Sequence, residues 1–178
     1  GSTVVLANAA RTRGLLPMGE RLPKLRAMHE LAGQVSYFDP DPGHEPSLIL
    51  GGAGYWLPRT AGVCVGGSTY VPNAAESLVT AQGRVDIAGK LSGMLDVPKD
   101  ALAGWVAGGE GWAGWRAVVA GRLPVIGELE GAPGVWLACA YGSRGLTWSA
   151  LAGDIIAAAL HHEPLMLERD LLRAVAPR

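Results

Sequence analysis

The chain has 178 residues, a net charge of −1 and 26 glycines; 49% of its residues are hydrophobic and 17% are charged. The length is enough for a domain with a real core, and the near-zero charge gives the chain as a whole no electrostatic footprint for nucleic acid. A charged fraction below the roughly 25% of an average soluble domain predicts that another domain, a subunit or a large cofactor covers part of the surface.

The two cysteines, Cys64 and Cys139, stand alone in apolar strand-like runs, which predicts buried, reduced thiols in a cytoplasmic protein. No spacing of side chains predicts a metal site, no apolar run reaches the roughly 20 residues of a membrane span, and no signal peptide is recognisable. The basic cluster at Arg11, Arg13, Arg21, Lys24 and Arg26 is interpreted as a solvated face in preference to an RNA contact. Residues 1–2 are excluded from the fold argument as a cloning remnant or linker.

Apolar runs between turn residues predict a series of strands, beginning with a fully buried one at residues 3–7. Asp39-Pro40-Asp41-Pro42-Gly43 is a strong turn signal, and Arg59-Thr60-Ala61-Gly62 predicts an antiparallel hairpin. Residues 115–126 are expected to be extended because Pro124 bars a helical interior. The other predicted strands are residues 31–38, 47–50, 54–58, 63–70 and 135–140.

Helices are predicted between and after these strands. The apolar residues of 74–95 recur at near-helical spacing, although Gly83, Gly89 and Gly93 weaken that helix. Strands first with helices interspersed indicate an α+β or mixed α/β fold with an antiparallel sheet. The remaining helical segments are 149–160, rich in Ala, Leu and Ile, and 170–175, while 100–106 fits either a strand or a short helix.

The most informative segment is Tyr141-Gly142-Ser143-Arg144-Gly145-Leu146-Thr147, between the strand at 135–140 and the last long helix. A glycine-flanked turn that enters a helix leaves several backbone N–H groups pointing outward, with the positive end of the helix dipole behind them. Such donors suit an anionic or electron-rich ligand atom. The alternative interpretation is an ordinary strand–turn–helix corner.

Three other features of the sequence are candidate functional signals. Residues 109–114 satisfy the dinucleotide pattern G-x-G-x-x-G, but a strand follows where a helix should open, so the match is interpreted as a false positive. Arg116 lies among apolar and small residues, where it forms either a structural ion pair or a bidentate clamp for a substrate carboxylate. Tyr55 and Trp56 follow the glycine-rich residues 51–54 and either line a pocket or simply pack.

In combination, these motifs resemble the C-terminal part of the FAD-dependent amine oxidoreductases related to D-amino acid oxidase and glycine oxidase. Within that family the chain is similar to the oxidoreductase half of bifunctional tRNA-modifying enzymes. Gly142-Ser143-Arg144-Gly145-Leu146 before a small-residue helix is the most specific piece, whereas Gly121 stands where the family usually has Asp. The other resembling segments are Val4-Val5-Leu6-Ala7-Asn8, Gly33-Gln34-Val35-Ser36, Val65-Gly66-Gly67-Ser68-Thr69-Tyr70, Trp115-Arg116-Ala117, Arg122-Leu123-Pro124-Val125-Ile126-Gly127 and Glu163-Pro164-Leu165.

The resemblance implies a D-amino acid oxidase-like fragment with FAD as its cofactor. Residues 3–30 and 108–178 would complete the FAD-binding domain, and residues 31–107 would form an antiparallel-rich substrate-domain sheet with a helix. The implied reaction removes the carboxymethyl group from 5-carboxymethylaminomethyl-(2-thio)uridine at the tRNA wobble position. Arg116 falls where the family grips the substrate carboxylate, and Tyr55 is assigned to the same substrate site. The implied flavin-facing residues are Gly142, Ser143, Arg144, Gly145, Leu146 and Thr147.

The implied partners are tRNA and two regions of such enzymes that lie outside this sequence: the N-terminal FAD-binding half and the methyltransferase part. Two other functions remain open. One is a flavin-dependent oxidase of free amino acids, glycine or sarcosine. The other is a catalytically silent interaction domain of the same fold. No catalytic acid or base is assigned.

Overall fold

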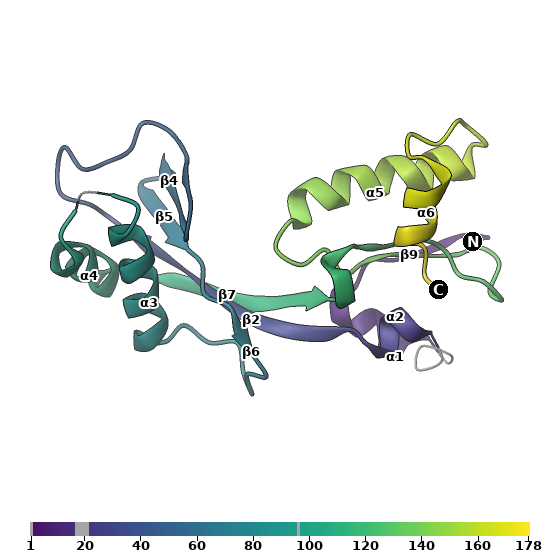
Figure 1. The fold of residues 1–178 in the computed structure, drawn as a ribbon, viewed down its shortest axis with the longest axis horizontal. Coiled ribbons are helices and arrows are strands. Elements are labelled where there is room, and N and C mark those ends of the chain that lie inside the picture. Colours follow the sequence, from purple (N-terminus) through teal and green to yellow (C-terminus); the bar gives the residue numbers. More distant parts are fainter. Residues whose placement is uncertain (1, 17–21, 96) are drawn as a thin grey trace. The chain divides into compact units, whose positions relative to one another are not determined.

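The computed structural model describes residues 2–16, 22–95 and 97–178, which pack as two units (Figure 1). The first unit contains Gly1–Glu30 and Arg116–Arg178, and the second contains Leu31–Trp115. The chain passes from one unit to the other inside two strands, β2 (His29–Phe38) and β7 (Gly111–Val118). Among the helices of the described residues, none has both the length and the apolar character to cross a lipid bilayer.

A three-stranded sheet organises the first unit. Its order is β1 (Val4–Leu6), β9 (Val135–Cys139) and β8 (Val125–Glu128), with β1 parallel and β8 antiparallel to β9. Leu137 and Cys139 of β9 enter one hydrophobic core, and Trp136 and Ala138 enter the other. Because both faces of β9 are covered, its apolar run is uninterrupted instead of alternating.

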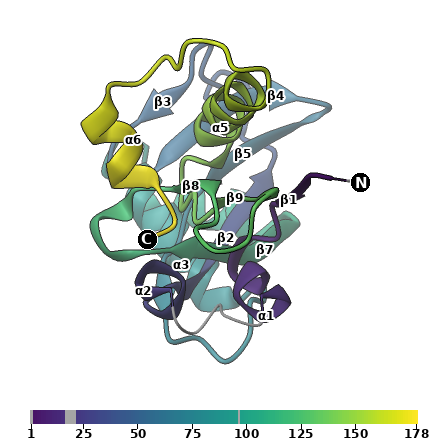
Figure 2. The same cartoon turned by 90° about the vertical axis from the view of Figure 1, so that its right-hand side faces the viewer.

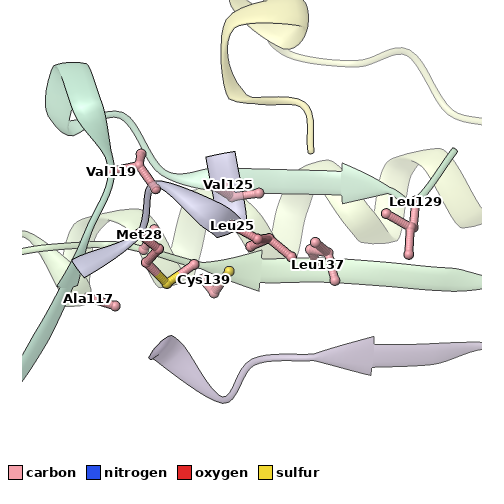
Figure 3. Packing of buried hydrophobic residues seen from close by; sticks show 9 residues of the cluster. Leu25, Met28, Ala117, Val119, Val125, Leu129, Leu137 and Cys139 are labelled. Carbon is pink, nitrogen blue, oxygen red and sulfur yellow. The ribbon is translucent and has the colours of Figure 1, made fainter. Parts of the chain in front are cut away.

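Helices cover this sheet on both sides, as Figures 1 and 2 show. On one side Ile155, Ile156 and Val175 pack against β8 and β9. On the other side Leu25 and Met28 pack against Leu137 and Cys139 (Figure 3). The helices are α5 (Gly145–Leu160) and α6 (Arg169–Val175) on the first side, and α1 (Thr12–Leu15) and α2 (Pro23–Arg26), preceded by the short helix η1 (Ala9–Arg11), on the second.

Lys24, a member of the basic cluster identified in the sequence, makes contacts that stabilise the fold. Its Nζ donates hydrogen bonds of 2.6 Å each to the carbonyls of Ala174 and Ala176, at the end of α6. Burial and the charge of Arg178 lower the pKa of Lys24, but the carbonyl partners suit its protonated form. Arg21, another member of the cluster, lies outside the described residues.

The prediction that residues 3–7 form a fully buried strand was wrong in its burial. Val4 is 50% exposed and Val5 is 45% exposed. The reason is that β1 lies at the edge of the sheet, with β9 on one side only in the described structure. An apolar edge strand is ordinarily paired or covered, because its free N–H and C=O groups invite another strand.

An antiparallel sheet and two helices form the second unit. Phe38, Trp56 and Cys64 pack against the helices, and the rings of Phe38 and Trp56 are 5.1 Å apart in an edge-to-face arrangement. The predicted α+β class is therefore confirmed. The sheet order is β3 (Leu50–Gly51), β4 (Tyr55–Thr60), β5 (Val63–Gly67), β2 and β6 (Val71–Pro72), with β7 beside β2; the helices are α3 (Ala81–Ser92) and α4 (Lys99–Gly108).

Several element boundaries differ from the predictions for local reasons. The β4–β5 hairpin forms as predicted, with Ala61 and Gly62 at φ of 52° and 90°. Helix α3 begins seven residues later than the predicted 74, where the Thr80 side chain accepts a hydrogen bond from the Gly83 amide. The ambiguous segment at 100–106 is helical, and the predicted strand at 47–50 shrinks to the two residues of β3.

Gln34 links β2 to the start of α3. Its side chain is buried, its Oε1 accepts a 2.9 Å hydrogen bond from the Thr80 amide, and its Nε2 donates a 3.2 Å bond to the Thr80 carbonyl. A β-carbon at Gly83 would lie only 2.1 Å from Gln34 Oε1. Gly83 was expected to weaken the helix. In the structure, its lack of a side chain leaves the space that the Gln34 side chain needs to bond Thr80.

We expect Gly83→Ala to lower the free energy of unfolding by about 1–3 kcal/mol, because the added methyl group displaces the Gln34 amide. Gly104→Ala is the matched control: it lies inside α4 with nothing within 4 Å of its would-be β-carbon. Replacing this helical glycine with alanine should raise the free energy of unfolding by about 0.5–1 kcal/mol. Urea titration of both variants tests this, and equal effects of the two changes would contradict it.

Candidate functional site

The chain reverses direction sharply as it leaves β9. Ala140 and Gly142 both adopt the left-handed conformation, at φ of 61° and 58°. The Arg144 amide then donates a 3.2 Å hydrogen bond to the Tyr141 carbonyl, which closes the turn. A left-handed alanine costs about 1 kcal/mol, and such strain concentrates at functional sites.

Helix α5 begins at Gly145, four residues earlier than the predicted start at 149. Its first i to i−4 hydrogen bond runs from the Trp148 amide to the Arg144 carbonyl, at 3.0 Å. The amides of Gly145, Leu146 and Thr147 therefore precede the helical ladder and point out of its positive end. The Leu146 side chain is 92% exposed and therefore does not pack over these three amides.

Arg116 lies on the strand that is bonded to this turn. The Gly142 amide donates a 3.0 Å hydrogen bond to the carbonyl of Ala117, the residue after Arg116. The Ala117 side chain enters the core around Met28, so alternation along β7 turns Arg116 and Val118 to the opposite side. A β-carbon at Gly142 would lie 3.9 Å from Val118 Cγ2. The half-buried Arg116 thus projects from the side of β7 that faces the turn.

The connection from β7 to β8 is equally tight. In the short helix η3 (Ala120–Arg122), Gly121 and Arg122 have φ of 78° and 56°, and the Arg122 amide donates a 3.0 Å hydrogen bond to the Val119 carbonyl. Glycine suits this left-handed position because it has no β-carbon. After this turn the chain enters β8, which pairs with β9. The end of β7 therefore lies beside the end of β9.

Cys139 and Tyr141, two titratable residues next to the turn, are neutral at ordinary pH. Burial raises the pKa of the Cys139 thiol to about 11. Burial, with a smaller contribution from the charge of Cys139, raises the pKa of Tyr141 to about 12. Cys139 is therefore a packed thiol and not a thiolate nucleophile. Both cysteines are buried and free, as predicted.

Tyr55, the other predicted substrate residue, belongs to the second unit. It lies on β4 in register with Gly67 of β5 and, through it, with Val35 of β2. A β-carbon at Gly67 would lie 2.7 Å from Tyr55 Oη and 3.0 Å from Val35 Cγ1. The Tyr55 ring therefore lies against the sheet over Gly67, on the face opposite α3 and α4, whereas Trp56 is fully buried in the core.

Two residues of the second unit, Tyr37 and Lys90, were not identified by the sequence analysis. Tyr37 is half-buried and, by alternation along β2, shares the face of Val35 and Tyr55. Lys90 of α3 donates a 2.7 Å hydrogen bond from Nζ to the Ser68 carbonyl, and this nitrogen lies 5.7 Å from the Tyr70 ring centre. The period of two along β2 could have identified Tyr37, whereas no local signal marks Lys90.

The residues of the first unit fit one end of a flavin. Outward amides at the start of α5 suit the electron-rich edge of an isoalloxazine ring, and the neutral Tyr141 adds no opposing charge. Residues 109–114 do not fit a pyrophosphate, because α4 ends at Gly108 and β7 begins at Gly111, the reverse of the required strand-to-helix order. Within the described residues, no group of three or more His, Cys, Asp or Glu side chains could hold a metal ion.

Comparison with known families agrees with this geometry. The family described as FAD dependent oxidoreductase, DAO, matches residues 1–159. The chain belongs to this family. Curated relatives are named tRNA 5-methylaminomethyl-2-thiouridine biosynthesis bifunctional protein MnmC. The protein from Cupriavidus necator is 38% identical over 98% of this chain, and the protein from Burkholderia thailandensis is 32% identical over 99%.

The chain spans only 30% of the Cupriavidus necator protein and 29% of the Burkholderia thailandensis protein. Among solved structures, glycine oxidase from Geobacillus kaustophilus matches with a TM-score of 0.79 at 18% identity, over 99% of this chain and 45% of that one. Iminodiacetate oxidase from a Chelativorans species matches with a TM-score of 0.71 at 20% identity, over 99% and 46%. The predicted family, fold and FAD cofactor are confirmed by these comparisons.

We expect the buried Cys139 to make stability fall at alkaline pH. Its pKa is about 11 in the folded chain against an ordinary value of 9.0, so between these values the unfolded chain releases a proton that the folded chain keeps. The free energy of unfolding therefore falls as pH rises from 9 to 11. Cys139→Ala should make the fall smaller by about 2 kcal/mol. Urea titrations across this pH window test it, and parallel curves for the two proteins would contradict the assignment.

Proposed function

We propose that this chain is part of an FAD-dependent oxidoreductase that removes the carboxymethyl group from 5-carboxymethylaminomethyl-(2-thio)uridine at the wobble position of tRNA. Support comes from family membership and from the 38% identity to a protein named for 5-methylaminomethyl-2-thiouridine biosynthesis. The observation that carries the proposal is the hydrogen bond from the Gly142 amide to the Ala117 carbonyl, which joins the amide-rich turn to the strand of Arg116.

The substrate chemistry explains the need for an arginine. The reacting group is a secondary amine bonded to CH₂–COO⁻, a glycine derivative, and its carboxylate must be held so that the CH₂ carbon is oriented for oxidation. The guanidinium of Arg116 offers a planar pair of donors that matches a carboxylate. In this proposal Arg116 binds and orients the carboxylate. Tyr55, which lies on the sheet of the second unit, is proposed separately as a substrate-binding residue.

The turn has a complementary role. FAD, when bound, supplies the electron acceptor for oxidation of the CH₂–N bond. The amides of Ser143, Gly145, Leu146 and Thr147 are proposed to donate hydrogen bonds to the ring edge where negative charge develops. The amides of Gly142 and Arg144, which bond the carbonyls of Ala117 and Tyr141, hold the turn in the shape that presents these donors. Oxidation of the CH₂ carbon gives an imine, and hydrolysis by water releases glyoxylate and leaves the aminomethyl uridine.

The rest of the FAD site is proposed to lie outside this sequence, because residues 109–114 form no pyrophosphate cradle. We assign the adenosine and pyrophosphate contacts to an N-terminal half and the companion reaction to a methyltransferase part. Partnership with tRNA through the full-length enzyme, and a reducing cytoplasmic location that suits the two buried thiols, belong to the same proposal.

Two competing functions are separated by direct assay. An oxidase of free amino acids would turn over glycine, sarcosine or D-amino acids, whereas the proposed enzyme acts on carboxymethylated tRNA. A silent interaction domain would bind no flavin even in the full-length protein. Flavin uptake by the full-length protein but not by the isolated chain would favour the proposed division of the site.

We expect Arg116→Leu in the full-length enzyme to raise KM for carboxymethylated tRNA by about 30- to 100-fold, because one charge-assisted carboxylate clamp is lost. Arg173→Leu, at an exposed position of α6, is the matched control and should leave KM unchanged. Steady-state kinetics with both variants decide the point. An unchanged KM for Arg116→Leu would remove its assigned role.

The role of the α5 amides is tested without removing a buried side chain. Leu146→Pro deletes one outward N–H in the first helical turn, where proline is tolerated, and we expect flavin affinity to fall about tenfold. Leu146→Ala deletes the same exposed side chain but keeps the amide, so it should bind FAD normally. Titration of the two full-length variants with FAD measures their dissociation constants for FAD. Equal dissociation constants would exclude the Leu146 amide from the flavin site.

A further inference from the structure

A hollow of about 640 Å³ lies in the second unit and plays no part in the chemistry proposed above. Its wall combines the end of β2, the turn between β4 and β5, and the last turn of α4. The residues that give it chemical character are Tyr37, Asp39, Trp105, Gly108 and Glu110. All of them come from Leu31–Trp115, so the hollow is a property of one unit.

Its charge is negative. The charged residues that line it, Asp39 and Glu110, are both acidic. The nearby guanidinium of Arg59 pairs with Asp39, donates a 2.9 Å hydrogen bond to Glu45 and donates another of 2.7 Å to the Gly62 carbonyl. Arg59 thus compensates part of the charge of Asp39 and Glu45, and the charge of Glu110 adds to the excess of carboxylates around the opening.

The end of α4 adds to this potential. The last carbonyls of a helix carry the negative end of its dipole, and a Lys or Arg side chain commonly compensates them. The last turn of α4, which is fully described, contains no basic residue. A β-carbon at Gly109 would lie 1.8 Å from the Tyr37 carbonyl oxygen, so this close approach holds the helix end beside β2 and at the hollow.

Aromatic rings complete the wall. Trp105 is half-buried and held in place by ring contacts, with centroids 6.3 Å from Trp56 and 5.4 Å from His44. The face of a Trp ring attracts cations, and it also provides apolar surface for an alkyl chain. A bare metal ion fits poorly, because no metal-binding group of side chains exists among the described residues and the hollow is far larger than an ion.

We propose that this hollow binds a small organic cation, a protonated amine or guanidinium carried on a short apolar chain. The two carboxylates and the α4 carbonyls accept hydrogen bonds from the charged head, and the chain lies along Trp105. The same negative potential repels phosphate groups, so nucleotides and the tRNA backbone are not ligands of this hollow.

The direct test is calorimetric titration of the full-length protein with agmatine, an alkyl guanidinium, at low salt. We expect saturable binding that weakens as salt is added. n-Butanol, which has an apolar chain without charge, should show no saturable binding. Absence of agmatine binding, or equal binding of the alcohol, would overturn the proposal.

Two substitutions locate the binding. Glu110→Gln should weaken agmatine binding by roughly fivefold through loss of one charge-assisted contact. Glu163→Gln removes the same charge at an exposed position of the first unit and should bind agmatine as the unsubstituted protein does. If the two variants behave alike, the cation binds elsewhere and the proposal fails.

Gly108→Lys provides a test that does not depend on damage to the fold. Nothing lies within 4 Å of the would-be β-carbon of Gly108, and a lysine there would end α4 with the basic residue that it lacks. The tethered ammonium should occupy the hollow, abolish agmatine binding and raise Tm. A variant with raised Tm and unchanged agmatine binding would contradict the assigned site.

Discussion

One backbone hydrogen bond, from the Gly142 amide to the Ala117 carbonyl, fixes the region on which the proposed chemistry depends. It is possible because Gly142 takes a left-handed conformation, which turns its amide towards β7 while the chain proceeds into α5. The bond therefore sets two things at once: the direction of the free amides at the start of α5, and the strand that carries Arg116. Separate flexible loops would position neither group accurately enough for catalysis.

The two proposed binding sites lie at opposite ends of two helices. The start of α5 presents unbonded amides at its positive end, which suits an electron-rich ring edge. The end of α4 presents carbonyls next to Asp39 and Glu110, which suits a cation. In both cases the helix supplies fixed partial charges that need no reorganisation on binding, and a glycine gives the ligand room to approach the backbone.

The sparse surface charge and the exposed edge strand have a common explanation. Val4 and Val5 of β1 are about half exposed on a strand whose other edge has no partner among the described residues. The relatives named MnmC are more than three times as long as the segment matched here. In the proposed assembly an N-terminal half covers β1, and burial of its valines adds to the stability of the FAD-binding domain.

The sequence by itself determined the features that depend on neighbouring residues. The apolar run of β9, the Ala61-Gly62 hairpin, the small-residue helix α5 and the false dinucleotide pattern were all readable from local composition and spacing. It did not determine where helices begin. Thr80 starts α3 through its own cap, and α5 starts at Gly145 because the turn at Gly142 is anchored to a strand 25 residues earlier.

Only the tertiary structure decided which distant residues share a surface. It turned Arg116 towards the Gly142 turn through the burial of Ala117, placed Tyr37 on the face of Tyr55, and brought Asp39 to the end of α4, where Glu110 follows in the sequence. These placements follow from strand register and core packing, which sum many long-range contacts. Alternation along one strand shows which of its own residues share a face, but it does not show which face is buried or which strand lies beside it.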